Sequence, residues 1–158
     1  MLKNIFTVML CLIASLYSHT LLANHSVEIN DAWISDAPPS AKIRAGYLTM
    51  HNPGEHEIVI KSFSSKDFAR IELHKTTLKD GMMKMEEIKN LTLKSGESIE
   101  FKPGGYHLML FSPKEKLKKA DKVRISVQLS GDETTFFTAT VQKRGDDTQQ
   151  NHEHHHHH

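Results

Sequence analysis

Two histidines and two methionines are spaced so that they could bind one metal ion together. His74 and Met85 lie on either side of Asp80-Gly81, a dipeptide that favours a two-residue hairpin turn because a type I′ turn needs positive φ at both central positions. With this turn, His74 lies opposite Glu87. Met85 then shares the face of His74 as a diagonal neighbour, within reach of a long side chain. The prediction depends on this register, since a slip of one residue would put the two side chains on opposite faces.

The second pair of candidate ligands is a His-x-Met sequence. His107 and Met109 are two residues apart, so in a strand they point to the same face. Leu108 and Leu110 would then face the opposite side, where a core is expected. Together with the first pair, His107 and Met109 make a candidate four-ligand site.

The types of donor atom select the metal. Thioether sulfur is soft and uncharged, and it suits Cu(I) far better than Ca²⁺, Mg²⁺ or Mn²⁺. Zinc prefers thiolate, imidazole and carboxylate, and a blue-copper electron-transfer site needs a cysteine thiolate. The single cysteine is Cys11, which lies in a segment expected to be removed. We therefore expect a Cu(I) site whose affinity falls in acid as the imidazoles become protonated.

The segments that must position these residues have the pattern of short β-strands. Val123, Ile125, Val127 and Leu129 alternate with polar residues, which is typical of a half-buried strand. Many short strands separated by turn residues favour a β-sandwich or barrel. A short helical turn is considered at 65–69. Strands are expected at 27–34, 46–50, 57–63, 70–78, 83–88, 91–93, 98–101, 107–111, 123–129 and 134–141.

Both ends of the chain differ from this central domain. Residues 1–23 combine Lys3, a short apolar run and Ala23, which predicts a secretory signal peptide cleaved near Ala23; the alternative is an uncleaved N-terminal anchor. The apolar run is shorter than the roughly 20 residues of a membrane helix. Residues 144–158 are polar and are expected to be a disordered tail. The histidine-rich stretch His152 to His158 is either an expression tag or a native tail that would form a second, Cu(II)-preferring imidazole site.

Length and composition exclude several classes of protein. A chain of 158 residues predicts one domain, at 24–143. A formal net charge of +1 gives no basic surface for nucleic acid, and one cysteine excludes a disulfide framework and a cysteine-rich zinc site. No nucleophile–base signature or paired-carboxylate motif stands out, so we do not expect an enzyme. The mature chain is expected to be exported and monomeric, with no membrane span after cleavage.

The spacing of the four candidate ligands resembles that of a known family. The pattern H-x10-M-x21-H-x-M, formed by His74, Met85, His107 and Met109, is similar to that of the periplasmic copper chaperones called PCuAC. The resemblance covers about residues 27–141 and includes Asp31-Ala32-Trp33-Ile34, Pro38-Pro39, Ala45-Gly46-Tyr47-Leu48, Glu72-Leu73-His74, Asp80-Gly81 and Lys102-Pro103-Gly104-Gly105-Tyr106-His107-Leu108-Met109-Leu110.

The resemblance implies an all-β, cupredoxin-like Greek-key β-sandwich that holds Cu(I) through His74, Met85, His107 and Met109. It also implies a periplasmic carrier that delivers copper, chiefly to the binuclear copper centre of cytochrome c oxidase subunit II, or to another copper chaperone. We expect acceptor thiolates to replace the two methionines stepwise, because thiolates outcompete neutral thioethers.

Two other functions are considered. The first is a periplasmic copper-sequestering or resistance protein without a dedicated acceptor, and the second is a β-sandwich recognition module whose histidines and methionines are incidental. One departure from the family concerns Lys75, since some members have methionine directly after the first histidine. A strand neighbour points away from the face of His74, so the site should tolerate this change. The change does remove an extra thioether. Met82 and Met83 lie nearby, and Met83, which has the parity of Met85, could supply that thioether during transfer, although packing is the favoured interpretation.

Overall fold

The computed structural model describes residues 27–143, which form ten β-strands and one short 3-10 turn. The expected signal peptide, with Cys11, and the histidine-rich tail lie outside the described residues. No helix among the described residues is long and apolar enough to span a membrane. The elements are β1 (Glu28–Ser35), β2 (Ile43–His51), β3 (Ile58–Ser64), β4 (Phe68–Lys79), β5 (Met82–Glu87), β6 (Leu91–Leu93), β7 (Ser98–Phe101), β8 (Tyr106–Pro113), β9 (Lys122–Leu129), η1 (Ser130–Asp132) and β10 (Thr134–Gln142).

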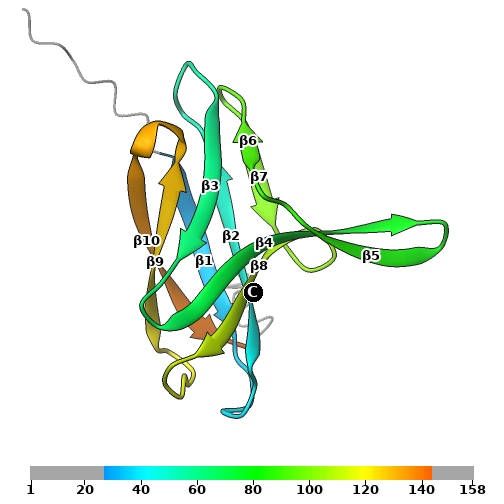
Figure 1. The fold of residues 1–158 in the computed structure, drawn as a ribbon, viewed down its shortest axis with the longest axis vertical. Coiled ribbons are helices and arrows are strands. Elements are labelled where there is room, and N and C mark those ends of the chain that lie inside the picture. The colour runs from blue at the N-terminus through cyan, green and yellow to red at the C-terminus, as the bar shows by residue number, and fades with distance from the viewer. Residues whose placement is uncertain (1–26, 144–158) are drawn as a thin grey trace, which may run out of the picture.

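The strands form one continuous sheet that curls into a barrel-like sandwich (Figure 1). Its order is β5-β4-β8-β7-β2-β1-β10-β9-β3-β6, and a further pairing of β3 with β4 closes it. Strands β7 and β8 both pair with β2, β7 near the end of that strand at His51 and β8 near its start at Ile43. The predicted all-β architecture is therefore confirmed.

Alternating side chains build the core, as β9 shows most clearly. Val123, Ile125, Val127 and Leu129 are at most 3% exposed, while the residues between them are exposed or half-buried. The predicted period of two is confirmed. The sandwich encloses the inward-facing half of each long strand, because burying apolar side chains is the main favourable term in folding.

Strands β4 and β8 carry three of the four candidate ligands, and β2 pairs with β8 on the side away from β4. Their inward faces are mostly apolar, with Leu73 on β4, Leu108 and Leu110 on β8, and Leu48 on β2 all buried; Arg44, at the start of β2, is the buried charged residue among them. At Gly46 on β2, an added Cβ would lie 3.0 Å from Leu110 Cδ1. The missing side chain thus allows β2 and β8 to approach closely behind the outward face.

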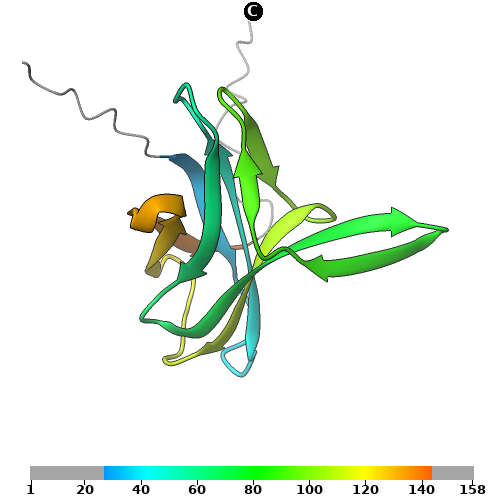
Figure 2. The ribbon, with the colours of Figure 1, turned by 45° about the horizontal axis from the view of Figure 1, so that its top comes forward.

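The hairpin between β4 and β5 has the predicted turn and register. Asp80 has φ 53° and Gly81 has φ 76°, the positive values that a type I′ turn needs. His74 pairs with Glu87 and Thr76 with Met85. The far part of this hairpin extends away from the sandwich (Figures 1 and 2), and we call residues 75–87 the arm.

The helical turn considered at 65–69 is wrong. Residues 66 and 67 form a turn, and β4 begins directly afterwards at Phe68. The Ser65 hydroxyl accepts a hydrogen bond from the Asp67 backbone N–H at 3.2 Å. This local side-chain bond offers the backbone an alternative to helical hydrogen bonding, so the chain reverses tightly between β3 and β4.

Candidate metal centre

The two candidate histidines face each other across adjacent strands. His74 on β4 pairs directly with His107 on β8, and their ring centroids are 6.0 Å apart with an interplanar angle of 33°. His107 is 7% exposed, and the His74 side chain is 14% exposed. The structure thus places two imidazoles side by side on the outward face of the sheet, shielded from most of the solvent.

Each imidazole has one ring nitrogen engaged by the protein. The Gly105 carbonyl oxygen can only accept, so His107 Nδ1 donates to it at 3.0 Å. His74 Nε2 donates in the same way to the Glu72 carboxylate at 3.0 Å. In a neutral imidazole the other nitrogen carries a lone pair, so His107 Nε2 and His74 Nδ1 are the nitrogens left for a metal.

His74 Nδ1 is buried and has no hydrogen-bond partner among the described residues. A buried polar atom without a partner costs about 1–3 kcal/mol, and native structures contain few of them. A metal ion bound to this lone pair would supply the missing partner. The site residues therefore fit a metal at the one atom of His74 that the protein leaves unsatisfied.

Glu72 holds His74 in place from the same strand. Its carboxylate also accepts a 2.7 Å hydrogen bond from Arg70 Nε, and the Arg70 guanidinium lies 3.8 Å from the centre of the Phe111 ring. The hydrogen bond from His74 lowers the pKa of Glu72 below its ordinary value of 4.5, and the hydrogen bond from Arg70 lowers it further by a smaller amount. The carboxylate therefore stays ionised, and its hydrogen bond fixes the tautomer of His74.

The two candidate methionines lie on the same face as the histidines but on opposite sides of them. Met109 pairs with Glu72, one diagonal step from His74 towards the body of the sandwich. Met85 pairs with Thr76, one diagonal step from His74 towards the arm. Met109 is half-buried, whereas Met85 is 54% exposed. The structure thus brings the histidines together and aligns both thioethers with them on one face.

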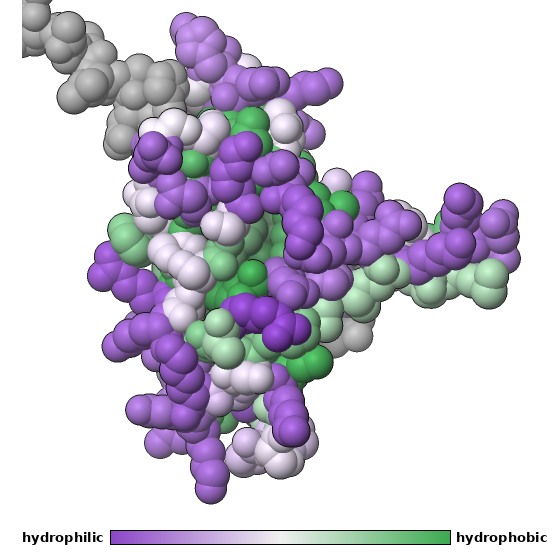
Figure 3. Space-filling view, viewed as in Figure 1, coloured by the Kyte–Doolittle hydropathy of each residue, from purple (hydrophilic) through white to green (hydrophobic). Residues whose placement is uncertain are grey.

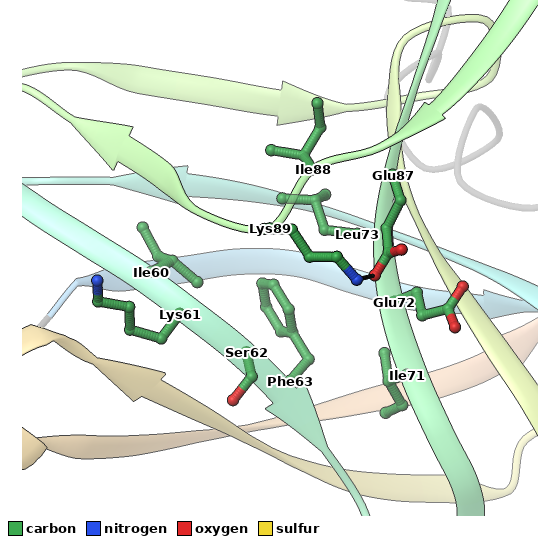
Figure 4. Close-up of a pocket in the computed structure, with 10 residues that line it drawn as sticks. All are labelled: Ile60, Lys61, Ser62, Phe63, Ile71, Glu72, Leu73, Glu87, Ile88 and Lys89. Carbon is green, nitrogen blue, oxygen red and sulfur yellow. Dashed lines mark hydrogen bonds and ion pairs between the residues drawn. The ribbon is translucent and has the colours of Figure 1, made fainter.

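The carboxylates nearest to His74 are already paired with cations. Glu87 lies opposite His74 in the hairpin and forms an ion pair with Lys89 (Figure 4). Glu72 accepts from His74 and Arg70. Among residues 27–143, no cluster of three or more His, Cys, Asp or Glu side chains could hold a metal ion. The oxygen donors of this region are therefore engaged, and its neutral nitrogen and sulfur donors are not.

A cavity of about 200 Å³ lies beside the site, between β3, β4 and the segment that follows β5 (Figure 4). None of the four candidate ligands lines it. Glu72 and Glu87 contribute to its wall, and Ile60, Phe63 and Ile71 line its apolar part. The cavity is therefore separate from the histidine pair.

Lys75 points away from the candidate site, as predicted for a strand neighbour of His74. It pairs with Tyr106, and its ammonium lies 4.7 Å from the centre of the Tyr106 ring. The replacement of a methionine by Lys75 therefore leaves the face of His74 unchanged.

Sequence reasoning missed the residues that support the two histidines. Glu72 has the parity of His74, two positions before it, and this signal could have identified it. Arg70 continues the same series. The role of the Gly105 carbonyl depends on the conformation of the Pro103-Gly104-Gly105 turn, in which Gly104 has φ 82°, and it could not have been read from residue types.

Solved structures share this architecture. The apo PCuAC domain of PmoF1 superposes with a TM-score of 0.63 at 15% identity, covering 75% of this chain and 94% of that chain. Apo-DR1885 from Deinococcus radiodurans gives a TM-score of 0.60 at 26% identity, covering 77% of this chain and 82% of that one. Its Cu(I) form gives 0.60 at 24% identity, with coverage of 84% and 87%. The fold is that of the cupredoxin-like PCuAC domains.

The family assignment follows from the sequence of the same domain. Residues 27–141 match the family described as "Putative lipoprotein LpqE-like", and the chain belongs to this LpqE-like family. The chain is 26% identical over 110 residues to "Putative lipoprotein Lxx21020" of Leifsonia xyli, covering 69% of this chain and 65% of that protein. It is 33% identical over 100 residues to "Uncharacterized protein RP573" of Rickettsia prowazekii, covering 63% and 51%. The matches thus span between half and two thirds of these relatives.

Proposed function

We propose that this chain is an exported copper carrier that binds Cu(I) through His74, Met85, His107 and Met109. The observation that carries the proposal is the buried, unpartnered Nδ1 of His74 next to the ring of His107. The similarity to PCuAC domains, one of which is a Cu(I) form, supports the choice of metal. Binding requires the two methionine side chains to converge on the histidine pair from opposite sides.

The donor set explains how such a site would bind and still release its cargo. Two imidazoles and two thioethers are all uncharged, and they favour a soft monovalent ion over hard divalent ions. Because thioethers carry no proton, replacing them by stronger ligands requires no proton transfer at the sulfur. A thiolate-rich acceptor can therefore remove copper by ligand exchange, with copper remaining Cu(I) throughout.

The acceptor that we propose is the binuclear copper centre of cytochrome c oxidase subunit II, or another copper chaperone that leads to it. The proposed compartment is the periplasm, which is consistent with the N-terminal pattern of the sequence and with the lipoprotein name of the relative from Leifsonia xyli. In this function the chain acts as a monomeric carrier and not as an enzyme.

The first test is Cu(I) binding by the full chain. We expect one tightly bound Cu(I) in a competition titration, and an X-ray absorption spectrum with sulfur as well as nitrogen neighbours. Sulfur neighbours distinguish the ordered site from the histidine-rich tail, because residues 144–158 contain no methionine or cysteine. His107→Ala and Met109→Ala should weaken binding, whereas His51→Ala, at the end of β2, serves as the control. A copper spectrum without sulfur would refute the proposed ligand set.

The second test separates delivery from storage. The loaded chain is mixed with a thiol-reduced fragment of subunit II, and the copper content of the two proteins is measured after separation. We expect copper to move to the fragment, and to move less from Met109→Ala. Copper that stays on the chain despite a competent acceptor would instead support sequestration.

A further inference from the structure

The arm has two chemically different faces. In the β4–β5 register, Leu78 pairs with Met83 and Thr76 with Met85, and directly opposite residues point to the same side of a hairpin. These four side chains therefore continue the face of His74 towards the tip. The other face carries Lys75, Thr77, Lys79, Met82, Lys84 and Glu86.

Met83 is not packed, so the favoured interpretation from the sequence is wrong. Its side chain is 62% exposed, Leu78 is 70% exposed, and every residue of β5 is exposed. Figure 3 shows moderately hydrophobic residues along the β5 side of the arm and hydrophilic residues along its β4 side. Apolar side chains gathered on one exposed face generally mark a functional surface, so the position of Met83 needs a reason other than core formation.

We propose that Met83 is a second, transient thioether ligand that accepts Cu(I) from the His74–His107 site and holds it near the tip of the arm during transfer. This inference rests on the proposed function. In the exchange, one Cu–S bond to Met83 forms as a bond to one ligand of the site breaks. The copper remains Cu(I), and no proton moves, because thioethers are uncharged in both states.

Position and chemistry single out Met83 for this role. It lies two residues from Met85 on the same face, about 7 Å along the strand, a distance that two long, flexible thioether side chains can bridge. Leu78 lies opposite it but has no donor atom. Met82 has the donor atom and is 61% exposed, but it lies on the other face, opposite Lys79.

The surroundings of Met83 also favour a soft ion. Thr76, between Leu78 and His74 on this face, offers only a hydroxyl. Glu87, the carboxylate at the base of the arm, is paired with Lys89. Glu86 lies on the opposite face, opposite Lys75. The thioethers of Met83 and Met85 are therefore the soft donors on this face of the arm.

The test compares Met83→Leu with Met82→Leu in the full chain. Both changes remove a thioether from nearly equally exposed, adjacent positions and keep the apolar character. The equilibrium affinity for Cu(I) is measured by competition, and the rate of copper release is measured by stopped flow with a synthetic dithiol peptide as the acceptor. We expect Met83→Leu to slow release by about tenfold, the lower end of the effects seen when a supporting group is removed from a metal site. Its affinity should change by less than about twofold, and Met82→Leu should alter neither quantity.

Several results would overturn the inference. An unchanged release rate in Met83→Leu, or equal slowing in Met82→Leu, would show that the thioether on this face has no special role. A loss of affinity in Met83→Leu as large as that in Met85→Leu would make Met83 a resident ligand. In each case the wild-type chain still binds one Cu(I) with sulfur neighbours, so the proposed function stands. A wild-type chain without such binding would remove both proposals.

A second measurement tests whether Met83 can reach the site. In Met85→Leu, we expect the X-ray absorption spectrum to retain two sulfur neighbours, from Met83 and Met109. In the double variant Met83→Leu with Met85→Leu, one sulfur should remain. A spectrum with one sulfur in Met85→Leu alone would contradict the substitution of one thioether by the other.

Discussion

The hydrogen bond from His74 to Glu72 determines which nitrogen of His74 can bind a metal. Glu72 accepts from Nε2, and this leaves Nδ1 buried with its lone pair. Arg70 keeps the carboxylate ionised through a 2.7 Å hydrogen bond, and Phe111 supports the guanidinium. A series of side chains on the outward face, reaching from β8 through β4, therefore prepares one imidazole for the ligand role.

The lowered pKa of Glu72 predicts a specific dependence of stability on pH. A carboxyl whose pKa is lower in the folded chain stabilises the fold above its unfolded pKa and loses that contribution as the pH falls through its folded value. We therefore expect the free energy of unfolding of the apo chain to fall below about pH 4.5 more steeply in the wild type than in Glu72→Gln. Urea unfolding across this range measures the difference.

The control for this prediction is Glu100→Gln. Glu100 forms an ion pair with Lys102 in which both side chains are about 60% exposed, and exposed pairs of this kind contribute little. Its pH dependence should follow that of the wild type. Parallel curves for the wild type and Glu72→Gln would contradict the role assigned to the Glu72 hydrogen bonds.

Among the secondary-structure elements, the sequence predicted the local features of the fold and missed the long-range ones. The ten strand segments and the Asp80-Gly81 turn depend on alternation and turn chemistry within a few residues, and all are present. The pairing of β4 with β8 joins His74 to His107, and no local pattern encodes which strands become neighbours. The family resemblance identified the four candidate ligands. That His74 and His107 lie directly opposite each other on neighbouring strands was seen only in the structure.

The turn at the tip of the arm should control the stability of β5. Gly81 has φ 76° and no atom near an added Cβ, so Gly81→Ala should cost only the backbone strain, about 1–2 kcal/mol. We expect the amides of β5 that pair with β4 to exchange their hydrogens several-fold faster, because β5 buries no side chain and opens locally. Hydrogen exchange followed by NMR gives this rate for each residue.

Gly105→Ala is the matched control for the turn. Gly105 does not have a positive φ, and an added Cβ would make an ordinary contact of 3.5 Å with the Lys102 carbonyl oxygen. Exchange in β5 should be unchanged in this variant. Equal rates in Gly81→Ala and the wild type would show that the arm does not depend on its turn conformation.

For the whole molecule, the candidate site exists only when the sandwich is assembled. His74 and Met85 come from one hairpin, and His107 and Met109 come from β8, which lies next to that hairpin through pairing that spans more than thirty positions of sequence. Buried Leu108 and Leu110 lie on the inward face of the same strand. The position of one ligand pair relative to the other is therefore set by the pairing of β4 with β8 and the packing of the core beneath them.

This dependence predicts that a bound monovalent soft ion stabilises the whole fold. A ligand that binds the folded chain alone adds about 2.7 kcal/mol to the free energy of unfolding when its free concentration is one hundred times its Kd. We expect Cu(I), or Ag(I) as a redox-stable substitute, to raise the denaturant midpoint by this free energy divided by the slope. The slope itself should not change, because the surface exposed on unfolding is the same.

The same measurement separates the ordered site from any metal bound by the histidine-rich tail. Five successive histidines, His154 to His158, need no fold to act as ligands, and metal bound equally by folded and unfolded chains adds no stability. His107→Ala should therefore lose the increment even though the tail is intact. His51→Ala, at the end of β2, where the ring contacts Ser98 of β7, should keep it. An increment that survives in His107→Ala would mean that the stabilising metal binds elsewhere on the folded chain, and the histidine pair would then have no part in holding it.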